Sequence, residues 1–526
     1  MANDVVDFQL GAAGLGLGAF SGVLDVLSTC SKLYGLWRSL RGLDGYLGLL
    51  RAKLILQEAL LDQWQRDWLS FTVSGKVALQ KQRLLKVHQN AVIVSLEVVR
   101  SLLESLEPLR EASKAPESAL ERLQLAAGGA TDCDKTLGQI SSMLNDLYRL
   151  LPPANPNVEV SQTVMSLEYI GCQGMPHCGA EKDVGLGSET FSRAMTFRQL
   201  GQDLEKDLED RISAFKHTLP TAELTMAPDR VRITANDEAS GGFRSFGTLD
   251  SKTPVVVEWK KYDLNWKGQK GIRLRGRIQN IARLLHADSK PDELLTLNCL
   301  GVFDDYEKSR YGLVFALPTG AEVDVEMRSM KSLLDQPTPE TLPTLGDRYR
   351  IAYSLTLSLA ILHASGWLQK SIRSHNIMFI IKAGRPVWSR PYLVGFDFSR
   401  PDSKDEVSEK PEQSVRFNLY RHSSAQGIPG ESFRKSFDIY SLGVVLLEIG
   451  LWRLAWSFRG DDTNAKKVQS IFTSKATSWL GHFMGVGYRD ATLKCLNGDL
   501  GQGDDSVVRA FYIEVVEIMG SLAESQ

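Results

Sequence analysis

Apolar positions in the first part of the chain recur at helical spacing. Between residues 33 and 50, leucines and Trp37 fall at i, i+3, i+4 and i+7, the period that places side chains on one face of a helix. Further stripes of this kind cover residues 56–68, 92–106 and 120–151. Amphipathic helices bury such faces by packing on one another, so the pattern predicts an all-α helical bundle over residues 1–217.

One stretch interrupts the helical pattern inside this predicted bundle. Residues 152–187 are rich in Gly and Pro and show little periodicity, which predicts a loop. A charged helix resumes after Ser188, a candidate helix cap, and carries the pattern to the end of the predicted bundle.

The second half of the chain changes from strand-like to helical patterning. Beyond a linker at residues 218–240, short β-branched runs such as "TPVVVEWKKY" and "RYGLVFALP" predict strands. From Pro343 onward helices return, most clearly in "DRYRIAYSLTLSLAILHASG" and "SFDIYSLGVVLLEIGLW". We therefore predict a multidomain chain, in which an α+β domain with two lobes occupies residues 241–526.

Composition narrows the class of protein only in part. The chain has 526 residues, 43% of them hydrophobic and 24% charged, which is enough for about two to four domains. Its 61 basic and 63 acidic residues nearly cancel, so charge gives no support for a nucleic-acid partner. The six cysteines are scattered, which fits a reducing intracellular compartment better than a disulfide scaffold.

The segment "CQGMPHC" comes nearest to a metal-binding motif. It holds Cys172, His177 and Cys178, but it lacks a fourth ligand and a CxxC pair. Structural zinc sites use four ligands, so no metal site is predicted here.

Residues 8–24, "FQLGAAGLGLGAFSGVL", contain no charged side chain. The run falls just short of the ~18 apolar residues expected of a membrane-spanning helix. Asp4 and Asp7 precede it, whereas a secretory signal begins with a positive region. Glycines at every fourth position form a doubled GxxxG pattern on one helix face, at Gly14, Gly18 and Gly22.

Two interpretations of this apolar segment stay open. The first is a buried helix whose glycines let neighbouring helices approach closely. The second is a helix that is sequestered in one state and inserted into a membrane in another, because glycines destabilise helices in water. In the second interpretation the membrane-active side chains are Phe8, Leu10, Leu15, Leu17 and Phe20.

Three segments between residues 361 and 450 resemble protein kinases in their order and spacing. The segment "ILHASGWLQKSIRSHNIMF" resembles the catalytic loop, and "YLVGFDFSR" resembles the strand and metal-binding turn that follow it. The segment "FDIYSLGVVLLEIG" is similar to the helix at the centre of the large lobe. The resemblance implies a bilobal protein-kinase-like fold.

The residues that a kinase uses for phosphoryl transfer are altered in the catalytic loop. Gln369, Lys370 and Ser371 stand at the positions of the His-Arg-Asp triplet. A serine hydroxyl holds its proton too tightly to replace the Asp as a base near neutral pH. Asn376 keeps its position, where it would either hold a metal ion or tie the loop together. The loop predicts a pseudokinase.

The metal-binding turn is altered as well. Aligning Arg400 with the arginine of the family pattern places Gly395 at the position of the magnesium-binding Asp. A slip of two residues would use Asp397 instead, in the alternative register. Asp438 matches the family aspartate that binds the backbone of the catalytic loop, which is a structural role.

The phosphate-binding lysine has two candidate registers in "VVVEWKKY". One register places Glu258 at the lysine position, and the other places Lys260 there. Lys260 is either a phosphate contact or a solvated strand lysine. No GxGxxG loop precedes this strand, and the helix "GIRLRGRIQNIARLLHA" offers no Glu to pair with the lysine. The cofactor that the resemblance implies is ATP, with or without Mg²⁺, at Lys260 and Asn376.

The altered residues also resemble a particular group of pseudokinases. Gly-Phe-Asp in place of Asp-Phe-Gly, together with "IRSHN", is similar to MLKL, the necroptosis pseudokinase. The start of the chain, "DVVDFQLGAAGLGLGAFSGVLDVLSTCSKLY", resembles the HeLo domain of the HET-s prion-inhibition and propagation family, and fungal proteins pair this domain with a kinase-like domain. The resemblance implies a helical bundle whose N-terminal segment permeabilises membranes in programmed cell death.

We therefore expect a cell-death or heterokaryon-incompatibility effector in which a pseudokinase restrains a membrane-active bundle. The expected partners are membrane lipids on activation and further copies of the chain, downstream of an unidentified sensor or kinase. The expected location is the cytoplasm at rest and the plasma membrane after activation. Phosphorylation would provide a trigger at serines in residues 401–436: Ser403, Ser408, Ser414, Ser423, Ser424 and Ser432.

Two alternatives remain from the sequence. A divergent ATP-dependent Ser/Thr kinase would use Lys260 together with Asp397. A signalling scaffold would use the bundle to bind partners without any contact with membranes.

Overall fold

The structure is a computed structural model in which the chain forms two compact units, Met1–Ser192 and Arg193–Gln526. The residues that it describes are 17–38, 53–54, 57–58, 61, 69–71, 77–79, 86–106, 130–150, 189–213, 224–237, 240–263, 269–318, 326–402, 414–426, 432–459, 462, 464–500 and 504–525.

Several of the predicted features lie outside the described residues. These are Phe8, Leu10, Gly14 and Leu15 of the apolar segment, the loop at residues 152–187 with its "CQGMPHC" motif, and Ser403 and Ser408. Leu17, Gly18, Phe20 and Gly22 lie within the first described helix.

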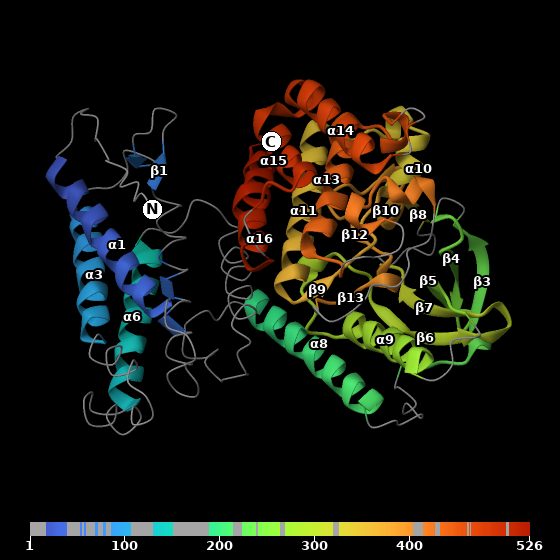
Figure 1. Ribbon diagram of the computed structural model, residues 1–526, viewed down its shortest axis with the longest axis horizontal. Coiled ribbons are helices and arrows are strands. Elements are labelled where there is room, and N and C mark those ends of the chain that lie inside the picture. The colour runs from blue at the N-terminus through green and yellow to red at the C-terminus, as the bar shows by residue number, and fades with distance from the viewer. Residues whose placement is uncertain are drawn as a thin grey trace. The chain divides into compact units, whose positions relative to one another are not determined.

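The first unit contains helices α1 (Leu17–Arg38), α3 (Lys86–Ser105) and α6 (Ala130–Leu150). Helix α1 packs against α3, and α3 packs against α6, as Figure 1 shows. Their buried faces hold Leu27, Tyr34, Leu96, Val99 and Ile140. A short hairpin of β1 (Leu69–Phe71) and β2 (Val77–Leu79) belongs to the same unit. The prediction of N-terminal helices is confirmed, whereas the hairpin departs from the predicted all-α character.

No helix in the described part of the chain combines the length and the apolar character needed to cross a membrane. Helix α1 contains Asp25, Lys32 and Arg38 in addition to its apolar residues.

Helix α8 (Glu189–Ser213) opens the second unit. The sequence pattern assigned this helix to the N-terminal bundle, whereas the contacts of its buried face lie in the second unit. The Nδ2 atom of Asn280 donates to the Leu204 carbonyl at 3.0 Å, and Leu208 packs at Gly276. Periodicity shows that a helix has an apolar face, but it does not show which surface covers that face.

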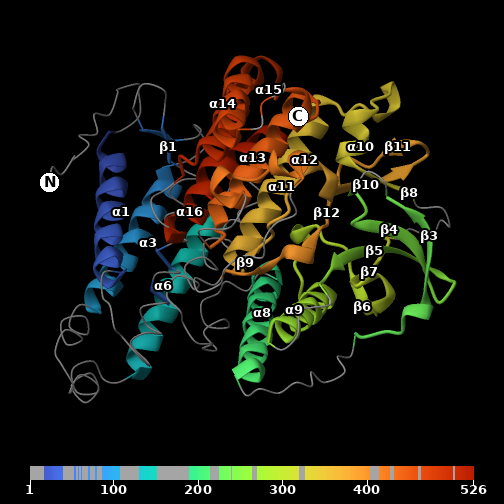
Figure 2. The ribbon, with the colours of Figure 1, turned by 45° about the vertical axis from the view of Figure 1, so that its right-hand side comes forward.

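A five-stranded antiparallel sheet follows in the order β3-β4-β5-β7-β6. Its strands are β3 (Val231–Asn236), β4 (Arg244–Leu249), β5 (Thr253–Lys261), β6 (Cys299–Asp305) and β7 (Arg310–Ala316). Helix α9 (Gln269–His286) packs against β6, and α8 runs beside α9 in both views (Figure 1, Figure 2). One face of the sheet holds a core cluster of Val255, Val257, Trp259, Phe303 and Val314.

The rest of the second unit is mainly helical. Helices α11 (Leu345–Ala364) and α13 (Lys435–Leu451) are buried over most of their surface, as expected of helices that are apolar all round. Helix α11 begins with a capping box in which Thr344 and Asp347 exchange hydrogen bonds. Around the two buried helices lie α14 (Ala465–Lys475), α15 (Gly481–Asn497), α16 (Asp504–Phe511) and α17 (Glu517–Glu524).

Short elements connect the sheet to these helices. Strand β10 (Ile377–Lys382) pairs with β8 (Glu326–Ser329), β11 (Arg385–Pro386) and β12 (Tyr392–Leu393), and β9 (Trp367–Leu368) pairs with β13 (Arg400–Pro401). Helices α10 (Met330–Asp335) and α12 (Val415–Asn418) complete this region. The prediction of a mixed C-terminal part, with antiparallel sheets and helices, is confirmed.

Candidate functional site

A buried carboxylate fixes the backbone of the loop between β9 and β10, which is the segment that resembles a catalytic loop. Asp438, in the first turn of α13, accepts hydrogen bonds from the backbone N–H groups of Gln369 at 2.8 Å and Lys370 at 2.7 Å. The His363 ring Nε2 lies 3.2 Å from the same carboxylate. Asp438 and His363 are both fully buried, so the loop is anchored to the interior of the helical part.

The Gln369 side chain of the altered triplet is used in internal hydrogen bonds. The Gln369 amide donates to the carbonyl oxygens of Val394 and Gly395, both at 3.1 Å, and its Oε1 accepts from the Ser371 N–H at 2.5 Å. The loop is thereby tied to the turn at residues 394–399. Neither Gln369 nor Ser371 ionises near neutral pH, so this pair supplies no general base.

Asn376 ties the loop together in the described geometry. Its Nδ2 donates to the Ser371 carbonyl at 2.9 Å, and its Oδ1 accepts from Arg244 Nη2 at 2.9 Å. A Cβ atom on Gly395 would lie 2.2 Å from Asn376 Nδ2, and Gly395 has a φ of +82°. Only glycine suits that position, since other residues would be strained and would collide with the amide.

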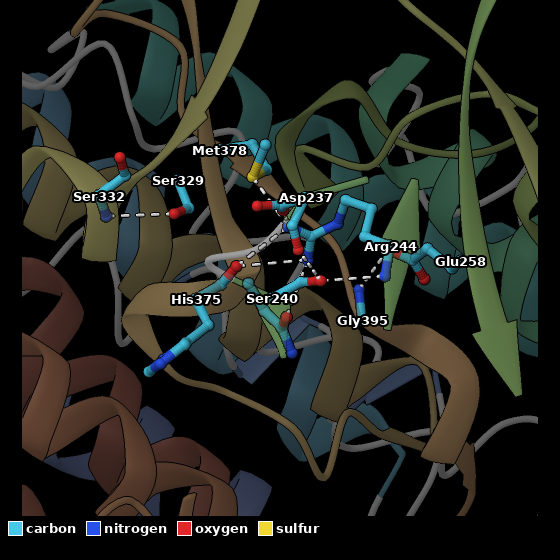
Figure 3. Close-up of polar contacts among 10 residues, drawn as sticks. Asp237, Ser240, Arg244, Glu258, Ser329, Ser332, His375, Met378 and Gly395 are labelled. Carbon is cyan, nitrogen blue, oxygen red and sulfur yellow. Dashed lines mark hydrogen bonds and ion pairs between the residues drawn. The ribbon is translucent and has the colours of Figure 1, made fainter. Parts of the chain in front are cut away.

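Arg244 is the residue that joins the sheet to this loop, and no sequence motif pointed to it. It lies in β4 and is 1% exposed. Its Nη1 donates to Asp237 Oδ2 at 2.8 Å and to the His375 carbonyl at 3.2 Å, and Figure 3 shows these contacts. Nη1 also lies 3.1 Å from Met378 Sδ. A single guanidinium therefore reaches from the sheet into the loop before β10.

Glu258 lies on the neighbouring strand, directly across from Arg244 in the register of β4 and β5. Its two carboxylate oxygens accept from the backbone N–H groups of Gly395 at 2.7 Å and Phe396 at 3.2 Å. Burial raises the pKa of Glu258, while the positive charge of Arg244 opposes this shift. Glu258 thus binds the turn, whereas Arg244 binds the loop.

The structure places both candidate lysine registers on one face of β5. Side chains two residues apart point the same way along a strand, so Glu258 and Lys260 share the face opposite to Trp259. The Lys260 ammonium lies 3.4 Å from the centre of the Phe398 ring. Asp397 is buried in the same turn, and its charge contributes to the raised pKa of Glu258. The structure therefore brings Lys260, Glu258 and the turn with Asp397 together.

An aromatic side chain from α12 covers the same loop. The Phe417 ring meets the rings of Phe243 and His375 edge to face, with centroids 5.8 Å and 5.3 Å away. The Arg373 guanidinium lies 3.9 Å from the Phe417 ring centroid. A Cβ atom on Gly241 would come 3.3 Å from the Phe417 ring, so this close approach uses the small size of glycine. Phe417 thus links the turn before β4 to the loop before β10.

A second buried carboxylate holds the segment after α12. Glu448 on α13 accepts from the Tyr420 hydroxyl at 2.7 Å and from the Ala455 N–H at 2.7 Å. The Tyr420 hydroxyl also lies 2.8 Å from Ser374 Oγ in the loop. Burial raises the pKa of Glu448 to about 7.

The donor set at this loop matches the nucleotide site that the sequence resemblance implies only in part. In one strand register a triphosphate would meet the carboxylate of Glu258, whereas in the other it would meet Lys260, the cation that phosphate binding calls for. The Asn376 oxygen that would bind Mg²⁺ instead accepts from Arg244. Among the described residues, no group of three or more His, Cys, Asp or Glu side chains is arranged to hold a metal ion.

Comparison with known proteins does not assign the chain to a family. The chain matches no protein-family model, and no curated protein sequence matches it significantly. Among the network residues that the sequence patterns did not single out are Asp237, Arg244, Phe417 and Tyr420. Each occupies an ordinary polar or aromatic position in its local sequence, so only the tertiary contacts distinguish it.

Proposed function

We propose that the second unit is a protein-kinase-like regulatory module that does not transfer phosphate, and that it restrains a membrane-active N-terminal unit in a cell-death or non-self-recognition response. The observation that carries the regulatory part is the buried network of Arg244 and Glu258. These two side chains bind the loop and the turn that would hold catalytic groups in an active kinase.

The order of the elements supports a kinase-like fold. Three antiparallel strands, β3 to β5, precede α9, and β6 and β7 complete the sheet before the mainly helical part begins. A loop fixed by an aspartate of a central buried helix, here Asp438 of α13, also fits the sequence resemblance. Both features agree with the bilobal arrangement implied by the three motifs.

The chemistry of the loop supports a module without catalysis. Phosphoryl transfer requires a positioned base, a metal site and a cation at the phosphates. Here the corresponding positions hold Ser371, Gly395 and, in one of the two strand registers, Glu258. The module would therefore work through its conformation.

In this proposal, helix α8 links the regulatory role of the second unit to the membrane activity of the N-terminal unit. Its arginines hold it to the second unit: Arg193 Nη2 donates to the Lys290 carbonyl at 2.5 Å, and Arg198 donates to the carbonyl of Ala364 at the end of α11. Because α8 follows the N-terminal helices along the chain, a change that loosens it would alter the tether of the first unit. A trigger must favour one of the two states to have this effect.

The membrane part of the proposal is supported by the uncharged segment at residues 8–24 and by its resemblance to HeLo domains. In this view Phe8, Leu10, Leu15, Leu17 and Phe20 enter the bilayer, and the face of Gly14, Gly18 and Gly22 packs against further copies of the chain. Lipids and self-association are the partners, with the protein cytoplasmic at rest and at the plasma membrane after activation.

The test is leakage of dye from anionic liposomes. The full chain is expected to release the dye, and deletion of residues 1–30 or the substitution Leu15→Lys is expected to abolish release. Val94→Lys, at a side chain of α3 that is 57% exposed, serves as the matched control and should leave leakage unchanged. Equal leakage from the intact and the deleted chain would contradict the proposal and favour a scaffold without membrane contact.

A further inference from the structure

Two aromatic side chains on the surface of the second unit contact each other where α14 is followed by α15. Trp479 is 49% exposed and Phe483 is 47% exposed, and their rings stack with centroids 6.3 Å apart. Large aromatic side chains usually lie in a core or an interface, because they remove much apolar area from water there. A stacked pair on the surface therefore indicates a site of interaction. Helices α14 and α15 lie near the top of the second unit in both views (Figure 1, Figure 2).

The backbone around the aromatic pair departs from a regular α-helix. Trp479 lies in a π-helical turn at Ala476–Leu480, and α15 begins directly after this turn. Turns of this kind are rare and frequently occur at functional sites. Helix α15 is then interrupted at Gly485, which has a φ of +78°. A Cβ atom there would meet nothing within 4 Å, so the backbone conformation rather than the packing favours glycine.

Two aliphatic side chains extend this surface. Val486 follows the interruption and is 58% exposed. Ile518, on α17, is 37% exposed, and its Cγ2 atom would lie 3.4 Å from a Cβ atom on Gly487. Helices α15 and α17 pack on each other, so these residues belong to one surface. We refer to Trp479, Phe483, Val486 and Ile518 as the apolar patch.

Buried residues that alternate with those of the apolar patch fix the backbone beneath it. Leu480, Met484 and Tyr488 are fully buried. The Tyr349 hydroxyl of α11 donates to the Met484 carbonyl at 2.9 Å. The Tyr488 hydroxyl donates to the Leu446 carbonyl of α13 at 2.8 Å. The core of the second unit therefore holds the apolar patch in place, and a binding partner does not have to order it.

The chain that carries most of the apolar patch is basic. Between Asp462 and Asp490 the sequence contains no Asp or Glu. Its basic residues there, apart from histidine, are Lys466, Lys467, Lys475 and Arg489. Lys467 lies 3.8 Å from Asp462, and Arg489 lies 2.7 Å from Asp490. Since these two pairs cancel, the other two lysines give the stretch its net positive charge.

Two basic side chains lie next to the aromatic pair. Lys475 precedes Trp479 by four residues, the spacing of neighbours on a helix surface. The exposed His482 ring meets the Phe483 ring edge to face, with centroids 5.0 Å apart. The apolar patch is therefore bordered by an ammonium group and by an imidazole that donates hydrogen bonds, and both groups are complementary to anions.

The size of the apolar patch favours a membrane over a protein partner. Four side chains that are about half exposed present at most ~500 Å² of surface. A stable protein interface needs about 800 Å² from each partner. Binding to a bilayer has no such threshold, because its strength scales with the apolar area inserted and with the attraction between basic side chains and anionic lipids. Tryptophan in particular is enriched at the interface between membrane and water.

We propose that the apolar patch is a membrane-contact site at which the second unit docks on an anionic bilayer. Trp479, Phe483 and Val486 enter the interface between headgroups and acyl chains, and Lys475 faces the lipid phosphates. The site uses none of residues 8–24, and it does not rest on the proposed function. It holds the second unit at the membrane surface whether or not the N-terminal segment inserts.

The experiment measures sedimentation of the full chain with vesicles of phosphatidylcholine and phosphatidylserine. Every chain carries Leu15→Lys, since this change is expected to abolish leakage through the N-terminal segment. Trp479→Ser combined with Phe483→Ser is expected to lower the partition coefficient at least about tenfold, because the inserted apolar area is lost. Tyr306→Ser, at an aromatic side chain of the second unit that is 71% exposed, is the matched control and should leave binding unchanged. Equal binding of the double variant and its parent would overturn the proposal.

A further variant tests the contribution of charge. Lys475→Glu is expected to weaken binding to the anionic vesicles at least about fivefold, the effect of one basic residue at an anionic surface. Unchanged binding of this variant would overturn the proposal.

Sedimentation equilibrium without vesicles tests a second copy of the chain as the partner. Dimers of the parent chain that the double variant abolishes would also overturn the proposal. Binding and leakage are measured separately, so the two proposals fail separately. A chain that binds vesicles through the apolar patch without releasing dye would contradict the proposed function and leave this site standing.

Discussion

At the scale of single residues, Arg244 is central to the site, although it lies outside the kinase-like motifs. Its guanidinium donates hydrogen bonds to Asp237 and Asn376, and the side chain is only 1% exposed. Removing one partner from such a buried set leaves the other charges without compensation. The free energy lost in this way is larger than the difference in stability between the ion pair and an apolar pair in its place.

Arg244→Met is therefore expected to lower the free energy of unfolding by about 3–5 kcal/mol, measured by urea denaturation. Arg230→Met is the matched control. Arg230 binds Asp250 at 2.6 Å, but both side chains are about half exposed, so its loss should have little effect. Equal effects of the two substitutions would mean that the Arg244 network does not hold the loop.

The sequence predicts the roles of some of these residues but not of others, and the difference has a physical reason. The sequence predicts the contact of Asp438 with the loop, because the position of this residue within a helix motif implies that contact. The arginine in "GGFRSF" has no such motif, since an arginine in a strand is most often solvated. Its burial depends on the loop before β10, which is more than 130 residues further along the chain.

At the scale of elements, the segment from α12 to Tyr420 is held against α13 by the buried carboxyl group of Glu448. With its pKa raised to about 7 in the folded state, Glu448 binds a proton more tightly there than in the unfolded chain. This contribution to stability is fully present below the unfolded pKa of about 4.5. It is lost as the pH rises through about 7.

Urea denaturation between pH 4.5 and 8 is expected to show this loss in the native chain, with a difference of about 3 kcal/mol at most. Glu448→Gln should remove that part of the pH dependence. His375, whose pKa burial lowers to about 3, gives the opposite slope as the pH falls below about 6.5. The comparison of native chain and variant isolates Glu448, and identical pH profiles would contradict its assignment.

Element types followed from the sequence more readily than their partners did. The β-branched run in "TPVVVEWKKY" predicts β5, and the apolar runs predict α11 and α13, because these residue types and their spacing reflect local backbone geometry. The unit to which α8 belongs depends on the surface against which the helix packs. The sequence of the helix does not encode that surface. The π-helical turn at Ala476–Leu480 and the left-handed Gly485 within α15 likewise gave no periodic signal.

At the scale of the whole molecule, the division before Arg193 makes a prediction about fragments. A fragment of residues 193–526 is expected to fold cooperatively with a native-like melting temperature. A fragment of residues 218–526, cut at the boundary that the sequence suggested, lacks α8 and exposes the apolar surface that Phe197, Leu204 and Leu208 cover. Each such side chain contributes about 1.5–3 kcal/mol, so the shorter fragment should melt at a lower temperature or aggregate. Equal melting temperatures would show that α8 is not part of the second unit.

The central claim is that buried side chains in the second unit occupy the positions that phosphoryl transfer would require. The most direct measurement is transfer of labelled γ-phosphate from ATP by the purified full chain with Mg²⁺, to itself and to a generic protein substrate. The account predicts no incorporation above a blank without protein. Magnesium-dependent incorporation that disappears in Lys260→Ala or Asp397→Asn would contradict it and would make the chain a divergent kinase.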